Sequence, residues 1–160
     1  MMSVLKVLIF PDQRLRTVAL PVKRLDKKIN KLVTDLQETM YEGNGIGLSA
    51  TQVNVHKRVI VVDVSLEKDS PRAFINPQIK TIKPVEKLIN EEGCLSVPGQ
   101  FAEINRPDKC HIKYLDYNGK KRELIFDIEK YKKFKNKIKY FVVDKKPSEI
   151  ETINSYDTDH

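Results

Sequence analysis

The stretch Gly45-Ile46-Gly47-Leu48-Ser49-Ala50-Thr51-Gln52 indicates the fold when it is taken with a second stretch, Glu91-Glu92-Gly93-Cys94-Leu95-Ser96-Val97-Pro98-Gly99. Glycines and small residues in the first stretch let the backbone approach a ligand closely. The second stretch places a cysteine beside a glycine, after two carboxylates, and can present a thiolate to a metal or an electrophile. Each stretch alone is ambiguous, because glycine-rich turns are common and a lone cysteine is more often a small core residue.

The composition around these stretches predicts one globular domain. The chain has 160 residues, of which 40% are hydrophobic and 32% are charged, and a single core of that size needs no disulfides. No run of 18 apolar residues is present, so no membrane span is expected. Residues 1–6 lack the features of a secretory signal, which favours the cytoplasm. Cys94 and Cys110 are therefore expected as free or metal-bound thiols.

The net charge of +7 is concentrated near the C-terminus. Residues 125–146 hold eight lysines and three acidic residues. A basic segment of this kind suits either a solvated face or contacts with nucleic acid, and the sequence leaves both open.

One amphipathic helix is predicted over residues 26–41. Asp26 is the expected N-cap, and Gly43 follows as a stop signal. The apolar residues recur at helical spacing and predict one buried stripe, made of Ile29, Leu32, Val33, Leu36 and Met40.

The middle of the chain predicts antiparallel strands. Residues 57–64 contain a β-branched run, and residues 73–75 and 79–82 are shorter strand candidates. Residues 110–115 and 121–126 flank Asn118-Gly119, which predicts a hairpin with a type I′ turn. After Ile128 the apolar spacing favours a basic helix, although residues 140–143 also suit a short strand. These elements predict an α+β fold.

Taken together, the two opening stretches resemble two of the three signature motifs of peptide deformylases. Residues 11–16, 75–77 and 114–120 also resemble that family, and the likeness runs in the family's order over roughly residues 3–124. The resemblance implies a single domain over 1–160, family-like over 1–124 and divergent over 125–160. It further implies antiparallel strands packed around a helix, with a degenerate C-terminal helix.

The resemblance also implies a reaction, a cofactor and site residues. The family removes the formyl group from N-terminal formyl-methionine of nascent polypeptides, using Fe²⁺, for which Zn²⁺ or Ni²⁺ can substitute. The metal is held by the motif cysteine and by two histidines of a helical His-Glu-x-x-His, and it activates a water molecule. By resemblance Cys94 is a metal ligand, and Gln52 and the Leu95 N–H are oxyanion donors. Substrate contacts fall on Gly45, Gly47, Glu92 and Gly93. Ser49 stands where the family commonly has alanine.

The third motif is missing. The three histidines are His56, His111 and His160, and none belongs to a His-Glu-x-x-His. Ungapped counting from Cys94 places Asn136 and Tyr140 at the histidine positions and Lys137 at the glutamate, while a register with a deletion before residues 140–144 matches the next strand better. An amide and a phenol are poor ligands for such a metal, and a charged lysine is no base. These replacements suggest drift of the gene after residue 124.

Three hypotheses remain open from the sequence. The first is a deformylase-family hydrolase with lost or severely reduced activity. The second is an active enzyme with an unconventional metal site that uses His111 or His160. The third is a non-enzymatic binder of peptide ends, or of the ribosome through the basic segment 130–146. A monomer is expected in each case.

Overall fold

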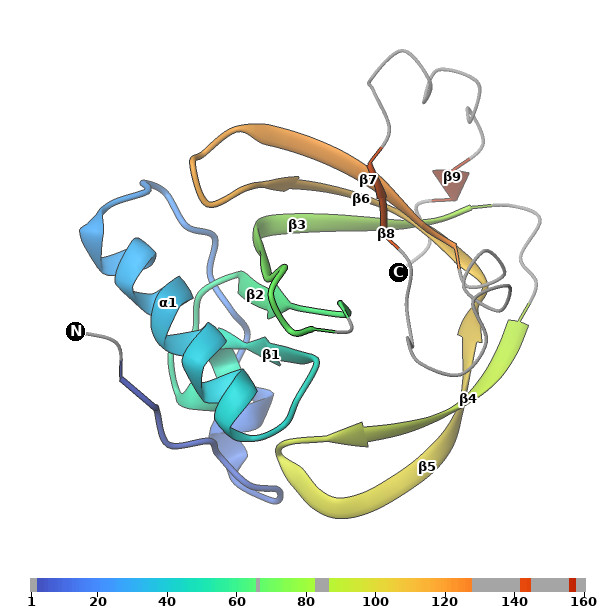
Figure 1. Cartoon of the computed structure of the whole chain (residues 1–160), viewed down its shortest axis with the longest axis horizontal. Coiled ribbons are helices and arrows are strands. Elements are labelled where there is room, and N and C mark those ends of the chain that lie inside the picture. Colours follow the sequence, from blue (N-terminus) through green and yellow to red (C-terminus); the bar gives the residue numbers. More distant parts are fainter. Residues whose placement is uncertain (1–2, 66, 83–86, 128–141, 145–155, 158–160) are drawn as a thin grey trace.

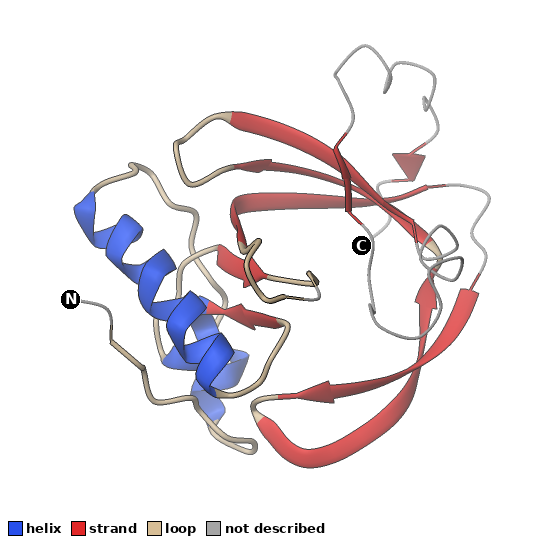
Figure 2. Cartoon of the chain, in the orientation of Figure 1, coloured by secondary structure: helices blue, strands red, loops and turns tan. Residues whose placement is uncertain are grey.

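The computed structural model describes residues 3–65, 67–82, 87–127, 142–144 and 156–157. Figure 1 shows one helix on one side of a large sheet, with a separate long hairpin curving away from it. The elements are η1 Gln13–Arg16, α1 Lys27–Glu42, β1 Gly47–Ser49, η2 Ala50–Val53, β2 Val59–Val62, β3 Arg72–Ile82, β4 Lys87–Cys94, β5 Val97–Pro107, β6 Lys109–Leu115, β7 Lys121–Asp127, β8 Val142–Asp144 and β9 Tyr156–Asp157. This arrangement of one helix and antiparallel strands confirms the predicted α+β class (Figure 2).

Helix α1 confirms the prediction from hydrophobic periodicity. The Asp26 carboxylate accepts hydrogen bonds from the backbone N–H groups of Lys28 and Ile29, and Gly43 forms the C-cap. Three residues of the predicted stripe, Val33, Leu36 and Met40, are fully buried, while the remaining two are partly buried. The helix therefore covers the core through the expected face.

The large sheet has seven strands in the order β1-β2-β3-β6-β7-β8, with β9 paired to β3. All the pairings are antiparallel. Two buried clusters fill it: one joins α1 to β1, β2 and β3, and the other contains Phe74, Ile112, Tyr114 and Leu124. The first cluster includes Leu48 and Ala50, so the glycine-rich stretch is anchored in the core by its own side chains.

Strand β3 corrects the prediction of two short strands at residues 73–75 and 79–82. It is continuous from Arg72 to Ile82, and its register against β6 shifts between Ile75 and Gln78. Asn76 occupies the shift with φ 51°, and its side-chain amide exchanges two 2.8 Å hydrogen bonds with the backbone of Val22. The irregularity explains how Pro77, which has no N–H to donate, sits inside a strand.

The β6–β7 hairpin is confirmed, but its predicted type I′ turn is wrong. Only Gly119 of the Asn-Gly pair has positive φ, at 77°. The Asp116 N–H donates to the Lys120 carbonyl and closes the loop. The Asp116 carboxylate accepts hydrogen bonds from the N–H groups of Asn118 and Lys120. Asp116 thus stabilises a three-residue loop in which a single glycine takes the left-handed conformation.

Strands β4 and β5 form a separate hairpin that the sequence did not predict. Ten of the eleven residues of β5 are exposed, so no buried face marks it as a strand. The predicted helix after Ile128 lies outside the described residues. Nearby, β8 at Val142–Asp144 pairs with β7, in agreement with the alternative of a short strand there. Within the described residues, no helix is long and apolar enough to cross a membrane.

Candidate functional site

Gln52 lies in η2, directly after the short strand β1, and its side chain is held at both ends. Its Oε1 accepts hydrogen bonds from the Ser49 N–H at 2.9 Å and the Ser49 hydroxyl at 3.1 Å. Its Nε2 donates to Ser96 Oγ at 3.1 Å and lies 3.6 Å from Cys94 Sγ. The structure therefore joins the glycine-rich stretch to the cysteine stretch through one amide.

Residues 94–97 form the tight turn of the β4–β5 hairpin, in which Cys94 pairs with Val97. The Cys94 side chain is exposed, whereas Ser96 is buried. The N-terminal segment connects both parts of the site, because Leu8 N–H donates to the Gln52 carbonyl at 2.7 Å and Phe10 N–H donates to the Ser96 carbonyl at 2.8 Å. The thiol is thus displayed at the surface on a backbone held from two sides.

Leu95 packs against the glycines at the end of α1. A Cβ added to Gly45 would lie 2.8 Å from Leu95 Cδ1, and one added to Gly43 would lie 3.0 Å from Leu95 Cδ2. Leu95 is partly buried against the main core cluster. Gly45 therefore permits the close approach of the two stretches, while Gly47 pairs with Val62 in the sheet.

Glu92 and Gly93 make contacts within the hairpin. The Glu92 carboxylate accepts from Arg106 at 3.0 Å and 2.9 Å, one bond to each oxygen. These hydrogen bonds hold the pKa of Glu92 below its usual value. A Cβ on Gly93 would lie 2.7 Å from the Phe101 ring. Substrate contacts at these two positions stay a prediction.

A family model for polypeptide deformylase matches residues 4–130. The chain belongs to the peptide deformylase family. Peptide deformylase 1 of Pseudomonas syringae pv. tomato is 53% identical over 129 residues, which cover 78% of this chain and 73% of that protein. The family consists of metal-dependent hydrolases that act on N-formyl-methionyl nascent peptides during protein biosynthesis.

Solved deformylases share the fold as well. The Thermotoga maritima enzyme has a TM-score of 0.73 at 36% identity, over 84% of this chain and 88% of that one. The Ehrlichia chaffeensis enzyme, solved in complex with actinonin, has a TM-score of 0.72 at 44% identity, over 76% of this chain and 74% of that one. The order of elements that places Gln52 beside Cys94 is therefore that of the family.

The side chains present do not fit the family's metal. Among the described residues, no group of three or more His, Cys, Asp and Glu side chains is arranged to hold a metal ion. The Cys94 thiol lies beside the Gln52 amide, which in turn binds the Ser96 hydroxyl, and an amide and a hydroxyl are weak ligands for Fe²⁺ or Zn²⁺. Asn136, Lys137 and Tyr140, expected at the third motif, lie outside the described residues. The part of the chain that the structure describes therefore supplies fewer ligands than a catalytic metal site uses.

The two described histidines lie away from this arrangement. His111 is buried on β6, and its Nε2 lies 3.1 Å from the Glu123 carboxylate of β7. Burial lowers the pKa of His111, although Glu123 opposes this effect, and Lys113 and Lys80 add to it. His56 is half-buried in the segment between η2 and β2. His160 lies outside the described residues.

Ser49 and Ser96 belong to the two motifs, but the sequence predicted no role for either side chain. Both hydroxyls contact the Gln52 amide, one at each end. The sequence signal for Ser96 is its position two residues after Cys94, inside the tight turn of the hairpin. No local signal links Ser49 to Gln52 except their spacing of three, which suits a capping arrangement.

Proposed function

We propose that this chain is a peptide deformylase-like protein whose hydrolytic activity is lost or severely reduced. One observation carries the proposal: Cys94 is presented beside Gln52 as in a deformylase, while the sequence has no His-Glu-x-x-His. Catalytic metal sites in hydrolases use three protein ligands and an open position. A single thiolate binds Fe²⁺ or a substituting Zn²⁺ or Ni²⁺ too weakly to generate hydroxide at neutral pH.

The residues that remain suit recognition better than catalysis. Gln52 and the Leu95 N–H are the proposed oxyanion donors, and they suit a formyl or peptide carbonyl oxygen in the ground state as well. Gly45 and Gly47 are the proposed pocket wall for an N-formyl-methionyl peptide, with Glu92 and Gly93 as further contacts. Without a glutamate to move protons, general acid–base catalysis, which contributes about 10²–10⁴-fold in enzymes, is missing as well.

The alternative is a non-enzymatic binder of peptide ends or of the ribosome. The clamped Gln52 amide supports peptide binding, because it is ordered by protein contacts alone. Ribosome contact would fall on the basic segment 130–146 and would weaken steeply with salt. Either activity belongs in the cytoplasm, where nascent chains emerge. An active enzyme that uses His111 is less well supported, because that side chain is buried against Glu123.

The deciding experiment combines metal analysis with hydrolysis of a formyl-methionyl tripeptide. The full chain is purified without oxygen and supplied with Fe²⁺ or Ni²⁺, beside the Pseudomonas syringae relative as a positive control. We expect much less than one bound metal per chain and turnover more than about 10³-fold below the control. Near-stoichiometric metal with turnover, both removed by Cys94→Ala, would refute the proposal.

If the chain proves inactive, a peptide-binding measurement distinguishes a protein that still binds formyl-methionyl peptides from one that does not. Without metal, isothermal titration with the same peptide is compared for the native chain, Gln52→Ala and the exposed control Gln100→Ala. Binding that weakens only in Gln52→Ala supports the recognition role. No binding in the native chain removes the peptide-binder alternative.

A further inference from the structure

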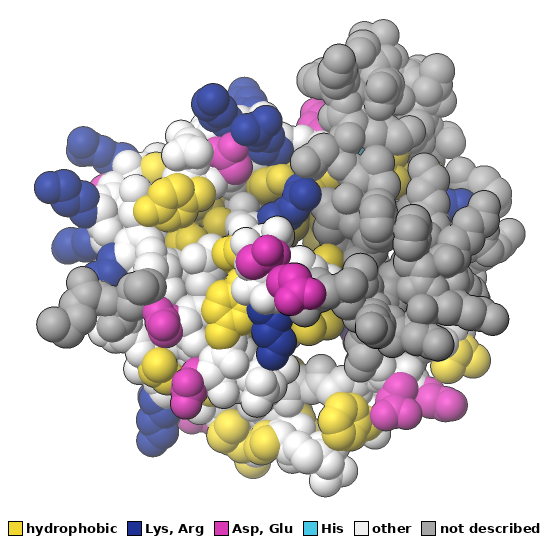
Figure 3. All heavy atoms as spheres, viewed as in Figure 1, with side chains coloured by type: hydrophobic (Ala, Val, Ile, Leu, Met, Phe, Trp, Pro, Cys, Tyr) yellow, Lys and Arg dark blue, Asp and Glu magenta, His cyan; other side chains and the backbone are white. Residues whose placement is uncertain are grey.

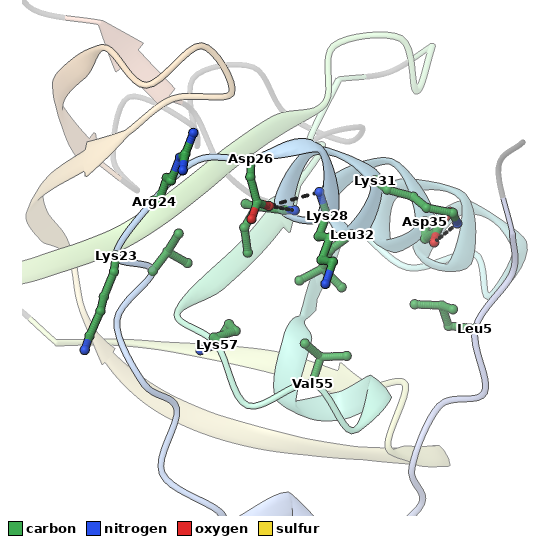
Figure 4. A pocket seen from close by; sticks show the side chains of 12 residues that line it. Leu5, Lys23, Arg24, Asp26, Lys28, Lys31, Leu32, Asp35, Val55 and Lys57 are labelled. Carbon is green, nitrogen blue, oxygen red and sulfur yellow. Dashed lines mark hydrogen bonds and ion pairs between the residues drawn. The ribbon is translucent and has the colours of Figure 1, made fainter.

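A basic groove lies along the N-terminal half of α1, outside the site already described. It has a volume of about 610 Å³, and its floor is aliphatic, with Leu32 and Val55 among the lining residues. Figure 4 shows the lining side chains coming from α1, the segment before it and the turn before β2, with Lys28 extending from the helix toward Val55. The groove combines an apolar floor with a cationic rim.

Its rim carries unneutralised charge. Lys23, Arg24, Lys28 and Lys57 line the groove, and within the described residues none of them forms an ion pair. Lys31 also lines it but is paired with Asp35 at 2.5 Å. Asp26, the N-cap of α1, also lines the groove, so the four cations without an ion pair outnumber this carboxylate by three. An excess of positive charge around aliphatic side chains fits a partner that presents carboxylates next to apolar groups.

The outer face of the β4–β5 hairpin presents that chemistry. Glu91 lies directly opposite Glu103, and Gly93 lies opposite Phe101, so these side chains share one face. Ile89, two residues from Glu91 on the same face, is 66% exposed, and Phe101 is 65% exposed. Two adjacent carboxylates are thus flanked by two exposed apolar side chains.

The two surfaces lie at opposite ends of the molecule. Figure 3 shows basic side chains gathered at the upper left, where Figure 1 places the start of α1, and acidic beside hydrophobic side chains at the lower right, where it places β4 and β5. A hairpin cannot reach the groove of its own chain across that separation. A contact between them must join two copies.

We propose that this chain self-associates head to tail, with the hairpin face of one copy seated in the basic groove of the next. Such a contact is heterologous, so each copy keeps one free groove and one free hairpin and assembly grows with concentration. The surfaces are small, which places the contact among weak, transient interfaces and leaves the expected monomer as the main species when dilute. The proposal does not depend on hydrolytic activity.

RNA is a weaker candidate for the groove. Its described lining contains no aromatic side chain, whereas single-stranded nucleic acid is bound largely by stacking of bases on aromatic rings. The aliphatic floor would gain nothing from phosphates. A hairpin with Ile89 and Phe101 beside its carboxylates uses both the rim and the floor.

The test is sedimentation equilibrium of the full chain at several concentrations. At about 0.05 M salt we expect the average mass to rise above the 18.5 kDa of one chain as concentration increases. Near 0.5 M salt it should return to 18.5 kDa, because rim charges are screened. A chain that stays at one mass at every low-salt concentration would overturn the proposal.

Charge reversal identifies the two surfaces. A groove variant, Lys23→Glu with Lys57→Glu, and a hairpin variant, Glu91→Lys with Glu103→Lys, should each stay monomeric alone. Mixed in equal amounts they should associate, because each retains the surface that the other has lost. Like the native chain, the hairpin variant has two like charges opposite each other at positions 91 and 103. The cross-strand repulsion is therefore similar in both, and the variant should fold equally well.

Control variants carry the same charge changes elsewhere. Arg16→Glu with Lys68→Glu, and Glu42→Lys with Glu67→Lys, lie outside both surfaces and should associate like the native chain. Loss of association in the controls, or no association in the mixture of variants, would contradict the head-to-tail contact. A native chain that stays monomeric but binds polyglutamate or RNA through the groove would assign the groove to another partner and overturn self-association.

Discussion

The buried Asp63 carboxylate, just after β2, provides the sharpest test of the packing. It accepts four hydrogen bonds: from the Tyr41 hydroxyl at 2.5 Å, the Ser65 hydroxyl at 2.6 Å, the Ser65 N–H at 2.8 Å and the Ser70 N–H at 3.1 Å. Burial alone would raise the pKa of Asp63, but these donors outweigh it and hold the pKa below its usual value. The charged form is therefore the one that the fold stabilises.

The substitution Asp63→Asn keeps the shape and removes the charge. The amide oxygen can retain the two Ser65 donors, but the amide nitrogen then faces the Ser70 N–H, and that bond is lost. Losing one charge-assisted hydrogen bond and weakening the others should lower the free energy of unfolding by about 3 kcal/mol. For a chain of this length that corresponds to a melting temperature lower by roughly 6 to 12 °C.

Thermal and urea unfolding, followed by circular dichroism, measure the change in the free energy of unfolding. Asp69 is exposed, so Asp69→Asn is the matched control, and its free energy of unfolding should lie within about 0.5 kcal/mol of that of the native chain. The stability from a carboxylate with a lowered pKa is present above its unfolded value and is lost as pH falls through the folded value. The difference between native chain and Asp63→Asn should therefore be full at neutral pH and shrink below about pH 4. Equal stability at pH 7, or a pH-independent difference, would refute this account.

Three further outcomes follow from other parts of the fold. Burial beside Asp63 raises the pKa of Tyr41 above its usual 10.0, so the native chain should lose stability above about pH 10 more steeply than Tyr41→Phe in alkaline unfolding curves. Asp26→Ala should lower the free energy of unfolding by about 1 kcal/mol in urea, while Asp26→Asn, which retains the cap, should change it little. Burial raises the pKa of the Cys110 thiol from 9.0 to about 11, so at pH 8 a maleimide should modify the exposed Cys94 first. The fast phase of maleimide labelling should be absent from Cys94→Ser and unchanged in Cys110→Ser.

Local patterns predicted the elements that bury one face. Helix α1 was predicted because its apolar residues repeat at the helical period and face the core. Strand β2 was predicted because it is a short run of β-branched residues, two of which are buried. The β4–β5 hairpin was missed because β5 is exposed almost throughout, which leaves no periodic signal. Its stability comes from eight cross-strand residue pairs and from contacts such as Glu92 with Arg106.

Special backbone positions were the second source of error. The sequence predicted two separate strands on either side of Pro77, but Asn76 adopts a left-handed conformation and β3 continues past it. Asn118 suggested a type I′ turn, yet the Asp116 carboxylate holds a longer loop in which Asn118 has negative φ. Both outcomes depend on side-chain hydrogen bonds that spacing along the chain does not reveal.

The site was predictable only in part. The resemblance to deformylases named Gln52 and Cys94, and the structure brings them within 3.6 Å across 42 positions of sequence. The clamp on Gln52 was not predicted, because its two serines lie in different elements and meet only after the fold forms. The catalytic roles of these residues stay predictions.

The N-terminal segment has a consequence for how such a protein can change over evolution. Its backbone links Leu8 to Gln52 and Phe10 to Ser96, and Ser3 and Leu5 bind Asp35 and Thr39 of α1. Every one of these hydrogen bonds joins residues numbered below 97. The hydrogen bonds that place Gln52 beside Ser96 thus depend only on the first three fifths of the gene, and mutations that remove the third motif leave them intact. Beyond residue 97, only the supports of Glu92 and Gly93 described above, Arg106 and Phe101, are exposed to such change.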